Sequence, residues 1–159
     1  MLMAYTYFHV ALSLVGIISG LVMLMAMASG KKMDGVTSVF LWTTILTSVT
    51  GFFFPFHGIT PGIIIGILSL VVLALALYAL RSQHLNGAWR TTFAICAVIA
   101  EYFNIFVLVA QSFRKIPALH ALAPTQSDGP FKITQTVVLV LVILLGVRAT
   151  RGFRKTATA

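Results

Sequence analysis

Apolar residues occur along this sequence in five long segments, separated by short polar or basic stretches. The segments cover residues 7–27, 37–54, 61–80, 91–112 and 132–147. A transmembrane helix needs about 20 predominantly apolar residues to cross a hydrocarbon core about 30 Å thick. The last segment is the shortest of the five. The pattern predicts an all-α integral membrane bundle of five transmembrane helices, formed as a single domain over residues 1–159.

Prolines indicate where some of these helices begin and end. Pro55 closes the second segment, because proline interrupts a helix and biases the preceding residue away from helical geometry. Pro61 suits the first turn of the third helix. The longest connection, residues 113–131, contains three prolines, and we expect turns there with one short interfacial helix near residues 118–123.

Basic residues divide unevenly between the two sides that five spans create. Cytoplasmic loops of membrane proteins carry an excess of Lys and Arg. One side receives eight of the 11 basic residues, namely Lys31, Lys32, Arg81, Arg90, Arg148, Arg151, Arg154 and Lys155. The other side receives Arg114, Lys115 and Lys132. The split predicts an N-terminus outside and a C-terminus in the cytoplasm. It also explains the net charge of +8 without a nucleic-acid partner.

Composition agrees with this class of protein. Hydrophobic residues make up 59% of the chain and charged residues 9%, whereas soluble domains are about 45–50% apolar and about 25% charged. The lone cysteine, Cys96, lies within an apolar segment, so one chain forms neither an internal disulfide nor a cysteine-based metal cluster. We expect the lipid bilayer to be the main partner.

Small residues recur at helical spacing within the predicted spans. In lipid, helices associate through small residues that let backbones approach closely and through interhelical hydrogen bonds. We therefore predict helix packing, without chemistry, at Ser13, Gly16, Gly20, Ser48, Gly51, Gly62 and Gly66.

The fourth segment carries three strongly polar residues on one helical face. Glu101, Asn104 and Gln111 share this face with Ala97 and Leu108, and they extend over ~15 Å of helix. Glu101 is the only acidic residue inside a span. A charged side chain at the bilayer centre costs about 3 kcal/mol, and such residues face the bundle interior or water. Glu101 is a functional candidate; the alternative is a neutral or hydrogen-bonded group that only fixes packing.

Histidines gather on the predicted outer side. His9 opens the first span and His57 lies in the next outer connection. Neutral imidazole ligates metals and haem iron, although histidine also suits a membrane interface because it has an apolar body and a polar tip. We prefer the second explanation and expect no metal site.

The polar residues together predict an outward-facing cluster. We expect His9, Asn104 and Gln111 to line it, Glu101 to lie at its inner end, and the loops with His57 and Gln126 to close over it. The alternative is a dry network of hydrogen bonds with no room for a ligand. Familiar catalytic motifs are absent from the sequence, so we assign no catalytic residue.

Four stretches resemble a group of small multi-spanning bacterial inner-membrane proteins of unknown function. They are residues 9–13, 47–57, 104–113 and 123–127. The resemblance implies a bacterial plasma (inner) membrane location and brings no activity with it.

Three functions fit the sequence, and we rank them in this order. The first is an accessory or structural subunit that packs against a larger membrane complex or forms a homo-oligomer. The second is an outer-leaflet binding module for haem, quinone or lipid. The third is a small transporter or proton-handling protein centred on Glu101.

Overall fold

The computed structural model describes residues 2–55 and 60–155, and helices form nearly all of them. In chain order the elements are α1 (Leu2–Ala28), α2 (Asp34–Gly51), α3 (Pro61–Leu77), a π-helical turn η1 (Tyr78–Ser82), α4 (Ala88–Lys115), α5 (Pro117–Leu122) and α6 (Gly129–Lys155). No strand occurs among the described residues. The prediction of an all-α protein is therefore confirmed.

Four helical stretches are long and apolar enough to cross a membrane. They are Met3–Ala28, Pro61–Ser82, Ala88–Lys115 and Gly129–Arg154. Helix α2 is less apolar because seven of its 18 residues are Ser or Thr and its first residue is Asp34. The four apolar helices indicate a multi-pass membrane protein.

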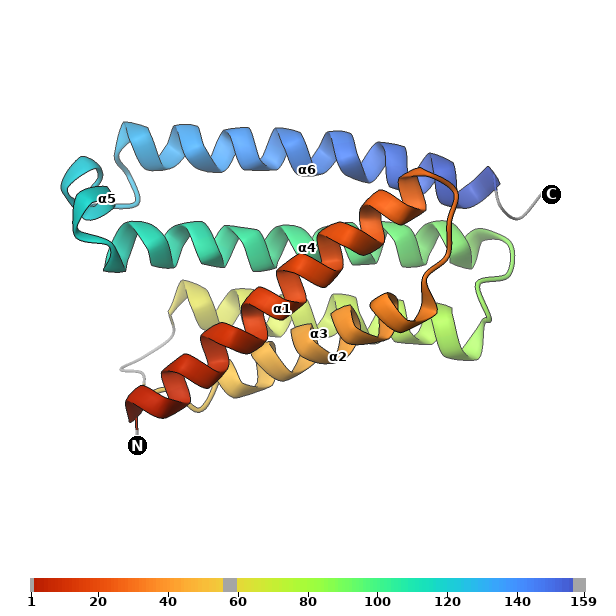
Figure 1. Ribbon diagram of the computed structural model, residues 1–159, viewed down its shortest axis with the longest axis horizontal. Helices are drawn as coiled ribbons and strands as arrows, with labels where there is room; N and C mark the ends of the chain where they lie inside the picture. The colour runs from red at the N-terminus through yellow and green to blue at the C-terminus, as the bar shows by residue number, and fades with distance from the viewer. Residues whose placement is uncertain (1, 56–59, 156–159) are drawn as a thin grey trace.

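The long helices lie alongside one another in an elongated bundle (Figure 1). Helices α4 and α6 run antiparallel, and α1 crosses them obliquely. Helix α3 packs against α4, and α2 packs against both α1 and α3. The N-terminus, α5 and the end of α2 lie at one end of the bundle, which we call the N-terminal end. The α1–α2 and α3–α4 connections lie at the opposite end with the last turns of α6. We call this the C-terminal end.

Several helix boundaries differ from the predicted ones. Helix α1 begins at Leu2 rather than residue 7, and α2 ends at Gly51, where the amides of Phe52 and Phe53 bond to carbonyls three residues back. Helix α6 reaches Lys155, far beyond the predicted end at residue 147. The basic residues that end the apolar run are good helix formers, and buried Phe153 anchors the extra turns.

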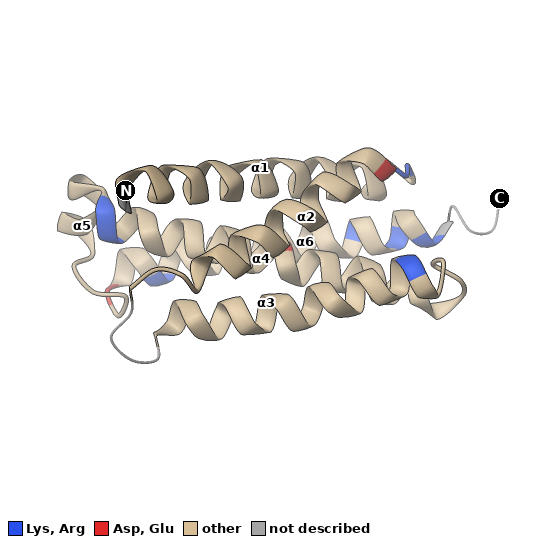
Figure 2. Ribbon diagram, turned by 90° about the horizontal axis from the view of Figure 1, so that it is seen from below, with Lys and Arg blue, Asp and Glu red and all other residues tan. Residues whose placement is uncertain are grey.

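Lys and Arg lie at the two ends of the bundle and are absent from its middle, where the acidic residue is Glu101 of α4 (Figure 2). Seven basic residues with described side chains belong to the C-terminal end, namely Lys31, Lys32, Arg81, Arg90, Arg148, Arg151 and Arg154. Arg114, Lys115 and Lys132 belong to the N-terminal end. This separation leaves a central zone without basic residues, as is typical of a membrane-spanning bundle.

The densest packing fills the half of the bundle nearer the C-terminal end. Its fully buried side chains come from five helices and include Leu24, Phe40, Leu73, Phe93 and Phe153. A smaller cluster of Phe113, Ala123 and Phe131 joins α4, α6 and the segment after α5 at the other end. Large apolar side chains cover the outside of the helices, as expected of a surface that faces lipid.

The connection before α6 is held by one carboxylate. Thr125 donates to Asp128 Oδ2 from its backbone N–H at 2.7 Å and from its hydroxyl at 2.9 Å. These hydrogen bonds, with a smaller contribution from Lys132, lower the pKa of Asp128. The carboxylate orders the turn that starts the last helix.

Candidate functional site

Glu101 lies at the centre of the bundle. It is residue 14 of the 28 in α4, about 20 Å from either end of that helix at ~1.5 Å per residue. Its side chain is 0% exposed, and neither carboxyl oxygen has a hydrogen-bond partner among the described residues. An ionised carboxylate in that position is very unfavourable, so the neutral, protonated acid is the form that fits the packing.

A glycine on α1 makes room for this carboxyl group. A Cβ atom at Gly20 would lie 2.2 Å from Glu101 Oε2 and 2.8 Å from Phe40 Cδ2. Any larger residue at position 20 forces the acid or the ring to move. Gly20 therefore gives α1 a contact with the one acidic residue in the interior of a helix.

Asn104 lies on the same face of α4, about one turn towards the N-terminal end. Its amide Nδ2 donates to Thr44 Oγ1 of α2 at 3.1 Å, and Thr44 is fully buried. Gly16 of α1 faces this pair, because a Cβ there would lie 3.3 Å from Thr44 Oγ1 and 3.8 Å from Asn104 Nδ2. Three helices thus enclose one interhelical hydrogen bond next to Glu101.

Threonines continue the polar side of α2 towards the N-terminal end. Thr44, Thr47 and Thr50 follow at steps of three, which keeps them on neighbouring parts of one helix surface. The Thr47 hydroxyl oxygen is buried and has no partner among the described residues. The distance from Thr44 to Thr50 along the helix is ~9 Å.

His9 of α1 closes this series near the N-terminal end. Its Nδ1 lies 2.9 Å from Thr50 Oγ1, and the Thr50 hydroxyl donates to the Leu46 carbonyl. We assign the proton to Nδ1, so that His9 donates to Thr50. The ring also meets Phe54 edge-on at 5.1 Å, and it lies beside Gly51, where a Cβ would be in ordinary contact with His9 Cε1 at 3.7 Å.

These residues form a set that we call the polar track. It consists of Glu101, Asn104, Thr44, Thr47, Thr50 and His9. Burial decreases along it: Glu101 and Thr44 are fully buried, whereas Asn104, Thr47, Thr50 and His9 are half-buried. The track thus extends from the closed centre of the bundle towards its N-terminal end.

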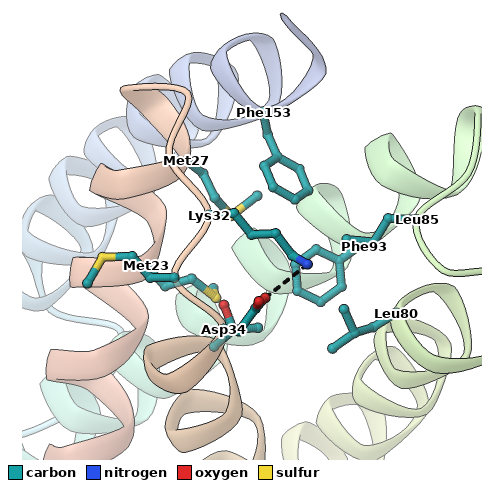
Figure 3. A pocket seen from close by; sticks show the side chains of 10 residues that line it. Met23, Met27, Lys32, Asp34, Leu80, Leu85, Phe93 and Phe153 are labelled. Carbon is teal, nitrogen blue, oxygen red and sulfur yellow. Dashed lines mark ion pairs between the residues drawn. The ribbon is translucent and has the colours of Figure 1, made fainter. Parts of the chain in front are cut away.

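The bundle is packed differently on the two sides of Glu101. Towards the C-terminal end, Ala94, Ala97 and Ala100 of α4 are 0% exposed, whereas residues 102–110 on the other side are each half-buried. Figure 3 shows a cavity beyond this dense zone, lined by residues that include Met23, Met27, Leu80, Leu85, Phe93 and Phe153. Its volume of about 10 Å³ is barely room for one water.

An exposed ion pair lies at the edge of that cavity. Lys32 Nζ and Asp34 Oδ1 form an ion pair 3.0 Å apart at its edge (Figure 3). The dense half offers Glu101 no polar neighbours comparable with Asn104 and Thr44. The polar neighbours of Glu101 therefore lie towards the N-terminal end.

The structure brings some of the predicted site residues together and separates others. Glu101, Asn104 and His9 belong to the polar track. Gln111 and Gln126 are exposed side chains, so they are not part of it. His57 lies outside the described residues.

The predicted packing residues also differ among themselves. Gly16 and Gly20 are buried, and a Cβ at Gly66 would lie 3.0 Å from the Phe52 ring. Ser48 and Gly51 are half-buried, and Ser13 bonds to the Val10 carbonyl of its own helix. Gly62 is exposed, and a Cβ there would meet Thr60 Oγ1 in ordinary contact.

Two features of the site are not among the residues predicted from the sequence. Thr44, Thr47 and Thr50 lie outside the predicted polar cluster, although their spacing of three residues is a readable signal. Gln135 was not assigned either; its Nε2 donates to the Phe106 carbonyl at 3.0 Å and ties α6 to α4. No group of three His, Cys, Asp or Glu side chains suited to a metal ion occurs within the described part of the chain.

Comparisons with known proteins add no assignment. A scan against protein-family models, a search of curated proteins and a search of solved structures each found no match.

Proposed function

We propose that this chain is a five-span bacterial plasma-membrane protein that binds and releases a proton at Glu101. One observation carries the proposal: the only acidic side chain in the interior of a described helix is fully enclosed at mid-bundle, and neither of its oxygens has a hydrogen-bond partner within the described part of the chain. Ionisable residues inside membranes are costly and mark proton and substrate pathways. The polar track gives Glu101 a route to the N-terminal end.

The proposed topology has five spans, with the N-terminal end outside. Helix α2 is the fifth span: its 18 residues cover ~27 Å, and it packs between α1 and α3. Its threonines and serines lower its hydropathy, but Thr37 and Thr44 are buried. The excess of basic residues at the C-terminal end supports a cytoplasmic location for that end.

Reporter fusions test this topology. Alkaline phosphatase, which is active only outside the plasma membrane, should be active when inserted after Gln126 and inactive when fused to the C-terminus. The physical reason is the charge difference between the two ends, since Lys- and Arg-rich loops stay in the cytoplasm. An active C-terminal fusion with a normal amount of protein would contradict the odd number of spans.

Proton flux tests the role of Glu101. In proteoliposomes with an imposed pH gradient and a pH-sensitive dye, we expect flux above that of empty vesicles, and its loss in Glu101→Gln, which keeps the shape of the side chain but cannot ionise. Thr44→Val, which removes the hydroxyl that accepts from Asn104, should slow it. Ser69→Ala is the matched control, because Ser69 is 3% exposed and lies on α3, outside the polar track.

An unchanged flux in Glu101→Gln would overturn the proton-handling proposal. So would a wild-type flux equal to that of empty vesicles at every gradient and direction. The melting temperature of each variant in detergent separates loss of flux from loss of folding.

An accessory or structural subunit is the second candidate. The tight enclosure of Glu101 by Gly20 and Phe40 favours it, because a neutral acid in a dry interior can serve packing alone. On this proposal the partner is a larger membrane complex or a second copy of the chain. A wild-type protein that is folded but carries no proton flux in proteoliposomes would favour this role. The described geometry gives no comparable support to a haem or quinone site, since the His9 ring is bonded to Thr50 and packed on Phe54.

A further inference from the structure

A hollow at the C-terminal end is lined by basic and hydroxyl side chains. It has a volume of about 440 Å³, and its lining consists of Gly87, Ala88, Arg90, Thr91, Thr92 and Arg154. Helix α4 supplies most of these residues from its first turns, and α6 supplies Arg154 from its last. The volume is in the range of pockets that hold small molecules.

Arg90 is fixed in place at this hollow. Its guanidinium carbon lies 4.9 Å from the centre of the Phe153 ring, and its Nη1 donates to the Phe153 carbonyl at 3.3 Å. Its Nε is buried and has no partner among the described residues. A guanidinium held in this way is well suited to an oxygen anion at its exposed edge, because its planar fork matches phosphate geometry.

The acidic side chains of the chain lie away from these arginines. There are three acidic residues: Asp34 is paired with Lys32, Glu101 is enclosed at mid-bundle, and Asp128 lies before α6 at the other end. None of the three lines the hollow. No acidic side chain therefore competes there with an external anion for Arg90 and Arg154.

We infer that this hollow binds the phosphate of an anionic lipid headgroup. Arg90 and Arg154 would contact the phosphate oxygens, and the hydroxyl of Thr91 is a further donor on the lining. The site lies where the apolar helix α4 begins, which is the depth of the headgroup layer if α4 crosses the membrane. Basic pockets between helices on the cytoplasmic side bind anionic headgroups in this way. The inference rests on the proposed topology, which the reporter fusions test separately, and it is independent of a proton-handling role for Glu101.

Native mass spectrometry with added lipid tests the site. We expect phosphatidylglycerol to bind more tightly than phosphatidylcholine, and Arg154→Gln and Arg90→Gln each to weaken that binding about fivefold, the effect of one arginine near an anionic surface. Arg90→Lys should retain part of the affinity, because it keeps the charge and loses the planar fork. Arg114→Gln, which changes an exposed arginine at the opposite end, is the matched control.

Three results would overturn the inference. The first is equal binding of the two lipids, and the second is unchanged phosphatidylglycerol binding in the Arg90→Gln/Arg154→Gln double variant. The third concerns the source of the phosphate: if inorganic phosphate at equal concentration displaces the lipid, the site is one for a free anion. Arg154→Gln keeps the test decisive if Arg90→Gln fails to fold, because Arg154 is exposed.

Discussion

Among substitutions that add one methyl group to this protein, Gly152→Ala is expected to cause the largest loss of stability. A Cβ at Gly152 would lie 2.4 Å from the Met27 carbonyl oxygen and 2.5 Å from the Ala28 carbonyl oxygen. These are backbone atoms, so relief requires α1 and α6 to separate. We expect a cost of about 3 kcal/mol, the upper part of the usual range for overpacking.

Thermal unfolding in mild detergent measures this effect. Gly35→Ala is the matched control, since a Cβ there meets nothing within 4 Å and alanine is the better helix former. The control should melt at or above the wild-type temperature while Gly152→Ala melts well below it. Equal melting of Gly152→Ala and wild type would show that the α1–α6 contact is looser than described.

Gly20→Ala is expected to have the second largest effect, on both stability and the site. The added Cβ would lie 2.2 Å from Glu101 Oε2 and 2.7 Å from Cδ of the same side chain. Glu101 must leave its position, and Phe40, at 2.8 Å, restricts the available space. We expect a loss of about 2 kcal/mol in the free energy of unfolding.

A double-mutant cycle isolates the contact between Gly20 and Glu101. Glu101→Ala removes the group that the new methyl would strike, so Gly20→Ala/Glu101→Ala should lose less stability than the sum of the two single variants. Coupling energies between residues in contact are about 0.5–3 kcal/mol. Gly62→Ala, at an exposed glycine, should change little. Strictly additive losses would place the Glu101 carboxyl away from Gly20.

The sequence by itself determined the membrane class and the distribution of charge. Hydropathy and the positions of Lys and Arg are local properties of the chain, and transfer into lipid depends on them segment by segment. Glu101 was identified for the same reason, since a carboxyl group within an apolar run is unfavourable in any arrangement of the helices. The short helix α5 followed from the prolines around it.

Helix lengths were less well determined. The apolar run ends at residue 147, but α6 continues to Lys155 because Ala149 and Phe153 pack into the bundle. Hydropathy identifies the part of a helix that is stable in lipid. It does not identify further turns that tertiary contacts stabilise outside the apolar run. The basic residues at that end are therefore helical rather than a tail.

Only the tertiary structure decided which polar residues meet. Asn104 and Gln111 lie on one face of α4, yet Asn104 contacts α2 whereas Gln111 is exposed. The reason is the oblique crossing of α1 over α4 (Figure 1): two helices that cross at an angle cover each other only near the crossing point, and a shared face is left open farther away. Helical spacing specifies the face that a residue occupies, but the crossing angle decides how much of that face is buried. Here it left Asn104 in contact with Thr44 of α2 and Gln111 exposed.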